Sequence, residues 1–221
     1  KSRIISNKQQ LLRIDSETTA PISEKESNEL MKKLNSLLID GIDAIIFEDY
    51  NKGVLTESLI QQIIAFAKIN HIITCVDPKF ENFLLYKTVD LFKPNLKELK
   101  EGLKCEFNMQ TSSNKLIDAV TKLEQKLSNS ISLITLSEYG VFVKKGDLIH
   151  TAKAHPRNIS DVSGAGDTVI AVACLCLLSD LSYKEIGEIA NIAGGLVCEH
   201  AGVVSINKDA LLEEVNKLLT Q

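Results

Sequence analysis

The stretch of the chain best suited to chemistry covers residues 161–168 and reads DVSGAGDT. Its small residues Gly164, Ala165 and Gly166 let a ligand approach the backbone closely. The apolar run that follows predicts a helix that begins here. The first turn of a helix has free N–H groups and a positive dipole end, so this turn is expected to attract a phosphate group.

Asp167 comes directly after these small residues. An anion bound at the turn would repel its carboxylate, so the acid needs a reason to be there. One reason is catalytic: Asp167 takes a proton from a hydroxyl that attacks the bound phosphoryl group. The alternative is that Asp167 and Thr168 cap a buried helix. The glycines alone favour the cap, because short glycine motifs recur by chance.

A second candidate site is Asn95-x-x-Glu98, which follows a short apolar run. An amide oxygen and a carboxylate one helical turn apart lie on one face of a helix. Such a pair can orient a hydrated Mg²⁺, which prefers oxygen ligands and keeps part of its water shell. The alternative is an ordinary capping box, with Asn95 as N-cap and Glu98 at the third helical position. Taken alone, this pair favours the capping box.

Apolar runs of strand length alternate with helical patterns along the chain. This alternation predicts an α/β fold, with a mainly parallel sheet and helices on both faces. Short strands are expected at residues 3–15, 43–47, 72–76, 91–92 and 131–135, with a hairpin at 141–151. Helices are expected near residues 24–38, 56–66, 113–127, 165–178, 183–200 and 208–219, with a short helical piece at 81–86.

Polar residues gather just after the expected strands. Open α/β sheets bind ligands at the carboxyl ends of their strands. This convergence is better evidence for a site than any single motif. The residues concerned are Asp49, Asp77, Lys79, Asn95, Glu98, Ser137 and Glu138.

Composition limits the function classes. The chain has 221 residues, which suits one sizeable domain, and its formal net charge of −4 argues against broad nucleic-acid binding. The longest strongly apolar run is too short to span a bilayer. Five cysteines without framework spacing indicate a reducing compartment and therefore the cytoplasm. The cysteines and histidines show no metal-ligand spacing.

Together these motifs resemble the ribokinase-like (PfkB) family of sugar kinases. The resemblance implies a three-layer αβα sandwich that uses ATP and Mg²⁺. It implies Asp167 as the catalytic base, Gly164, Ala165 and Gly166 as the anion hole, and Asn95 and Glu98 as the metal motif. The expected nucleotide-binding residues are Ser137, Glu138, Gly140, Gly164, Gly166 and Asn191.

Within that family, the chain resembles the bacterial heptose-7-phosphate kinases that supply lipopolysaccharide core synthesis. The loop Asp49-Tyr-x-Lys52-Gly53 and the run Asp77-Pro78-Lys79 carry this likeness, together with polar residues of the first 15 positions. The resemblance implies that residues 1–15 are lid strands that also form a homodimer. It implies substrate contacts by Arg13, Asp49, Lys52 and Lys79. No HxGH signature of a fused nucleotidyltransferase occurs, which favours a kinase-only protein.

The likeness covers residues 1–221 as a single, partial kinase domain. The family's N-terminal part and most of the lid are expected to be absent, so we expect little activity from these residues alone. Two other functions stay open. One is a kinase for another sugar or a nucleoside, and the other is a non-catalytic nucleotide-binding remnant.

Overall fold

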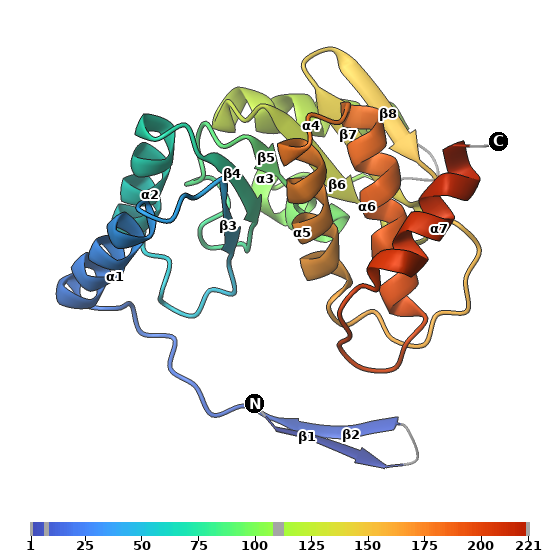
Figure 1. The fold of residues 1–221 in the computed structure, drawn as a ribbon, viewed down its shortest axis with the longest axis horizontal. Helices are drawn as coiled ribbons and strands as arrows, with labels where there is room; N and C mark the ends of the chain where they lie inside the picture. Colours follow the sequence, from blue (N-terminus) through green and yellow to red (C-terminus); the bar gives the residue numbers. More distant parts are fainter. Residues whose placement is uncertain (1, 7–8, 108–112, 220–221) are drawn as a thin grey trace.

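The structure, a computed structural model, describes residues 2–6, 9–107 and 113–219. It contains a small two-stranded sheet near the N-terminus and a six-stranded sheet that carries the rest of the chain (Figure 1). Helices lie on both faces of the larger sheet (Figure 1). The predicted α/β class and three-layer arrangement are therefore confirmed.

The six-stranded sheet has its strands in sequence order, from β3 to β8. The first four strands pair in parallel, and the last two add antiparallel. The carboxyl ends of the parallel strands therefore lie along one edge, where a ligand site is expected. The strands are β3 (Ala44–Glu48), β4 (Ile73–Asp77), β5 (Leu91–Phe92), β6 (Ile131–Thr135), β7 (Val141–Lys145) and β8 (Leu148–Ala152).

Side chains of successive strand residues enter two separate cores, as the two-residue period of a strand requires. On β6, Leu133 packs in one core and Ile134 in the other. The core containing Ile134 is shared with α2 (Glu57–Ile69), α3 (Leu96–Leu103) and α4 (Ser113–Leu127), and α1 (Glu24–Leu37) packs against it. The core containing Leu133 is covered by α5 (Ala165–Leu178) and α6 (Tyr183–Cys198), with α7 (Lys208–Leu219) beside them.

The N-terminal hairpin consists of β1 (Ser2–Ser6) and β2 (Gln9–Ile14), paired antiparallel. It lies apart from the main body, at the end of an extended segment that leads to α1 (Figure 1). Several of its large apolar side chains are exposed, among them Leu11, Leu12 and Ile14.

The expected helices are present, and local sequence explains where they begin. Ser23 and Glu26 form a complete capping box at α1, and Thr56 caps α2. One prediction is wrong: no short helix forms at residues 81–86, since residues 81–85 form turns and Tyr86 lies outside regular structure. Tertiary contacts explain this difference, because Asn82 donates to the carbonyl of Leu55 and Tyr86 is fully buried. In the described parts of the chain, every helix is too short or too polar to cross a membrane.

Candidate active site

The N-terminus of α5 lies at the centre of the candidate site. Gly164 is the N-cap residue, with φ of 83°, a left-handed conformation that favours glycine. No side chain caps this helix end. Asp167 lies in the first turn, exposed, so the capping interpretation of Asp167 and Thr168 is wrong. The first turn of a helix offers backbone N–H groups, although that of Ala165 donates to the carbonyl of Val162 at 3.3 Å. The same turn carries the Asp167 carboxylate, an arrangement suited to phosphoryl transfer.

Asp167 belongs to a cluster of three carboxylates from three elements. Glu48 ends β3, Asp77 ends β4, and each offers an oxygen within 4.8 Å of the other two. The hydroxyl of Tyr50, in the loop after β3, donates a hydrogen bond of 3.0 Å to Oδ1 of Asp167. The parallel strands thus bring residues from positions 48, 77 and 167 to one point.

Lys93 supplies the cluster's nearest positive charge. Its ammonium group lies 3.0 Å from Oδ2 of Asp77, and both residues are buried. A Cβ atom on Gly166 would lie 3.4 Å from that carboxylate and 3.5 Å from the ammonium group. The helix end therefore rests against the Asp77–Lys93 ion pair, at a distance where even an added Cβ would make only ordinary van der Waals contact.

The negative charges perturb each other. Burial, followed by repulsion from Asp77 and Asp167, raises the pKa of Glu48 to about 7. Burial, with the hydrogen bond to Asp167 next, raises the pKa of the Tyr50 phenol. Burial also raises the pKa of Asp77, although the neighbouring Lys93 and Lys79 oppose that effect. Perturbed groups gathered at strand ends are typical of functional sites.

Lys79 connects this cluster to the predicted metal motif. Its ammonium group forms an ion pair with Oε1 of Glu98 and lies 3.9 Å from Asp77. Asn95 and Glu98 form a complete capping box at α3. The capping alternative is therefore present in the structure, and Glu98 also takes part in the charge network of the site.

The loop after β3 differs from expectation in its details. Asp49 is buried and accepts hydrogen bonds from Tyr86 and Asn82, so it supports the loop from within. Lys52 forms an ion pair with Glu17, in the segment between the hairpin and α1. Neither contact joins these two predicted substrate residues to the carboxylate cluster. Arg13 lies in β2, and its side chain is outside what the structure describes.

Two of the predicted nucleotide residues, Gly140 and Asn191, lie against one short segment at the end of β8. A Cβ atom on Gly140 would lie 2.0 Å from the carbonyl oxygen of Ala152, so this turn packs tightly against the segment. Asn191 of α6 donates a hydrogen bond of 2.8 Å to the carbonyl of Lys153. Ser137 and Asn95 both line a hollow of about 540 Å³ that also contains Lys97 and Lys100. Ser137, a predicted nucleotide-binding residue, is thus a neighbour of Asn95 of the predicted metal motif.

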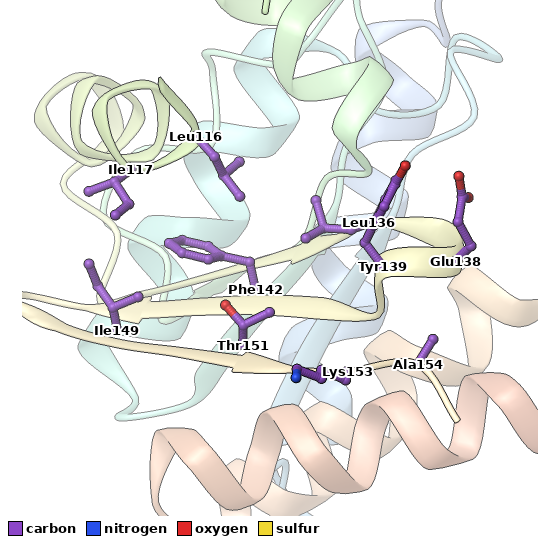
Figure 2. Close-up of a pocket in the computed structure, with 10 residues that line it drawn as sticks. All are labelled: Leu116, Ile117, Leu136, Glu138, Tyr139, Phe142, Ile149, Thr151, Lys153 and Ala154. Carbon is purple, nitrogen blue, oxygen red and sulfur yellow. The ribbon is translucent and has the colours of Figure 1, made fainter. Parts of the chain in front are cut away.

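Figure 2 shows a second, more apolar cavity, of about 530 Å³. Leu116 and Ile117 of α4 face Phe142 and Ile149 across it, and Glu138 lies at its other end. Asn191 is not one of the residues that line this cavity. Glu138 therefore borders a different hollow from the one that Ser137 and Asn95 share.

Three residues of the site had no role assigned from the sequence: Glu48, Tyr50 and Lys93. Glu48 is the last residue of β3, and Tyr50 and Lys93 lie in polar runs just after β3 and β5. That position is the signal that could have found them, because parallel strands end at a common edge. The sequence alone does not show which side chains of such a run turn toward α5.

A family model described as pfkB family carbohydrate kinase matches residues 3–210. The bifunctional protein HldE of Aliarcobacter butzleri is 36% identical over 218 residues, covering 99% of this chain and 45% of that protein. The same-named protein of Campylobacter jejuni is 37% identical over 212 residues, covering 96% and 44%. The chain thus spans less than half the length of these curated relatives.

Solved structures of sugar kinases share the fold. Phosphofructokinase-2 from Escherichia coli in complex with substrates and products has a TM-score of 0.77 and 17% identity, covering 97% of this chain and 68% of that chain. Arabidopsis thaliana ribokinase complexed with ribose and ATP has a TM-score of 0.67 and 18% identity, covering 87% and 59%. The chain therefore has the ribokinase-like fold and belongs to the pfkB family of carbohydrate kinases, enzymes that phosphorylate sugars with ATP.

Proposed function

We propose that the protein containing this chain transfers the γ-phosphoryl group of ATP to the C1 hydroxyl of a heptose 7-phosphate. The product would be the heptose 1,7-bisphosphate, a precursor for the lipopolysaccharide core, made in the cytoplasm. The observation that carries the proposal is the position of Asp167, which lies in an uncapped first helical turn where an anion binds well. The choice of a heptose is supported by the relatives named HldE.

In the proposed reaction, Asp167 takes the proton of the acceptor hydroxyl. The acceptor oxygen forms a bond to the γ-phosphorus, the bond to the bridging β–γ oxygen breaks, and ADP leaves. The N–H groups of Gly164, Ala165 and Gly166 hold the phosphoryl oxygens, where negative charge is greatest. Ser137, Glu138, Gly140 and Asn191 are proposed to hold the nucleotide.

Asn95 and Glu98 fit a hydrated Mg²⁺ better than a directly bound ion. Oε2 of Glu98 accepts from the N–H of Asn95, and Oε1 pairs with Lys79. Oδ1 of Asn95 accepts from the N–H of Glu98. These oxygens would receive hydrogen bonds from water ligands of the ion, since Mg²⁺ keeps several waters. When bound, Mg²⁺ neutralises charge on the phosphates.

Residues 1–15 are proposed to act as lid strands over the sugar. Exposed apolar side chains on the hairpin, including Ile4 and Leu12, support a homodimer formed through this element. Lys79, beside Asp77, and Lys52, at the segment leading from the hairpin, are proposed to contact the sugar phosphate.

The test is a coupled ADP-release assay on protein made from the complete reading frame. Heptose 7-phosphate, ribose and fructose 6-phosphate serve as acceptors in separate reactions. The proposal predicts turnover with heptose 7-phosphate, and phosphorus NMR should show the new phosphate on C1. Turnover with ribose or fructose 6-phosphate alone would support a kinase for another sugar. No turnover with any acceptor would support a nucleotide-binding remnant.

A further inference from the structure

We propose that Tyr50 is a positioning residue for Asp167. Its hydroxyl group holds Oδ1 of the carboxylate and directs Oδ2 to the acceptor hydroxyl. The inference rests on the proposed function, because it assigns Asp167 the role of base. It adds Tyr50, from the loop after β3, to the residues that act on the acceptor hydroxyl. The contact is a hydrogen bond of 3.0 Å between residues 117 positions apart in the sequence.

The loop that carries Tyr50 is anchored at the residue before it. Asp49 is buried and accepts hydrogen bonds from the hydroxyl of Tyr86 at 2.7 Å and from Asn82 at 2.9 Å. Its other oxygen accepts from the N–H of Asn51 at 2.8 Å. Asn51 has φ of 51°, a left-handed conformation that asparagine tolerates.

Two further contacts fix the direction of the loop. The N–H of Asp49 donates to the carbonyl of Asp77 at 3.1 Å, so β3 and β4 stay paired up to the site. Gly53 has φ of 79°, and a Cβ atom there would lie 2.1 Å from the carbonyl oxygen of Ala20. The loop is therefore held at both ends, and Tyr50 projects from a fixed base toward α5.

The charges around Asp167 explain why its carboxylate needs a hydrogen-bond donor such as Tyr50. Asp77 of β4 lies close to it, and Glu48 of β3 adds negative charge once it loses its proton, at a pKa raised to about 7. The positive groups on this side are Lys93, which pairs with Asp77, and Lys79, which pairs with Glu98. Repulsion would turn an unsupported carboxylate at this exposed position toward solvent.

Tyr50 is suited to the task because it stays a donor. Burial and the neighbouring carboxylates raise the pKa of its phenol, so the hydroxyl remains protonated throughout the physiological pH range. Its donation to Oδ1 leaves Oδ2 to face the acceptor, and the proton from the acceptor hydroxyl goes to Oδ2.

The test compares the wild type with Tyr50→Phe and a matched control, Tyr183→Phe. Tyr183 begins α6 and packs against the core that α5 covers. The control substitution therefore removes a phenol hydroxyl that does not contact Asp167. Tyr50→Phe should lower kcat roughly 10- to 100-fold, the effect of losing one hydrogen bond to a charged group. KM for ATP should stay as in the wild type, so the loss appears in kcat, and Tyr183→Phe should match the wild type in both constants.

A second readout does not depend on turnover. In protein with ¹³C-labelled aspartate carboxyls, the chemical shift of the Asp167 signal at neutral pH should change in Tyr50→Phe and not in Tyr183→Phe. An unchanged Asp167 signal, or an unchanged kcat, overturns the inference. If the wild type phosphorylates none of the acceptors, the proposed function fails, and the carboxyl signal still decides whether Tyr50 holds Asp167.

Discussion

The backbone N–H of Asn95 donates to Oε2 of Glu98 at 2.8 Å, and the N–H of Glu98 donates to Oδ1 of Asn95 at 2.8 Å. The same two residues that cap α3 also lie beside the predicted nucleotide turn, because Asn95 forms a β-bridge with Thr135. Glu98 is buried and pairs with Lys79, which ordinary capping does not require. A structural role and a metal role can therefore be separated by experiment.

Glu98→Gln should raise the Mg²⁺ concentration needed for half-maximal activity, because the amide binds the ion's water shell less strongly. As a cap alone, Glu98 would contribute about 1 kcal/mol of stability and leave the Mg²⁺ titration unchanged. Glu185→Gln is the matched control, since Ser182 and Glu185 form the same capping box at α6. Equal Mg²⁺ requirements in the two variants would assign Glu98 to capping.

Gly140→Ala should weaken ATP binding and lower the melting temperature. Gly140 has φ of 88°, and an added Cβ would lie 2.0 Å from the carbonyl oxygen of Ala152. Gly146→Ala is the control, because Gly146 has φ of 59° and open space around it, so only backbone strain of roughly 1–2 kcal/mol applies. Thermal unfolding and ATP titration measure both variants. Equal losses in both would contradict the close packing at Gly140.

Glu48 should make stability depend on pH in a defined direction. Burial and the nearby carboxylates raise its pKa to about 7 in the folded protein, so the folded state binds an extra proton between the ordinary glutamate value and about 7. Stability from this group is present at low pH and is lost as pH rises through that window. Glu48→Gln should therefore gain melting temperature relative to wild type as pH goes from about 5 to about 8. A constant difference across this range would contradict the assignment.

The fold was largely predictable because its signals are local. Alternating strand and helix patterns, the capping residues Ser23 and Thr56, and the turn at Gly146 each mark an element that the structure contains. The wrongly predicted helix at residues 81–86 has a tertiary cause, since Tyr86 donates a hydrogen bond to Asp49, which is distant in sequence. Contacts between residues far apart in sequence are not visible in local patterns.

The sequence predicted where the candidate residues lie along the chain but not the directions of their side chains. Asp167 lies in the first turn of α5 and Asn95 at the start of α3, as their motifs predicted. Asp49 and Glu48 are adjacent in sequence, yet a strand turns neighbouring side chains to opposite faces. Asp49 consequently faces the buried Tyr86, and Glu48 joins Asp167. Glu48 is also the register partner of Asp77 on β4, so these two acids end neighbouring strands side by side.

The central claim is that Asp167 accepts the proton in phosphoryl transfer, and kcat of Asp167→Asn tests it most directly. The coupled ADP-release assay should be run on wild type and variant, with saturating ATP and heptose 7-phosphate, and ATP affinity should be measured separately. Loss of a general base costs roughly 10²- to 10⁴-fold in rate. The account predicts a loss of that size with ATP affinity near that of the wild type, whereas turnover close to wild type would contradict it.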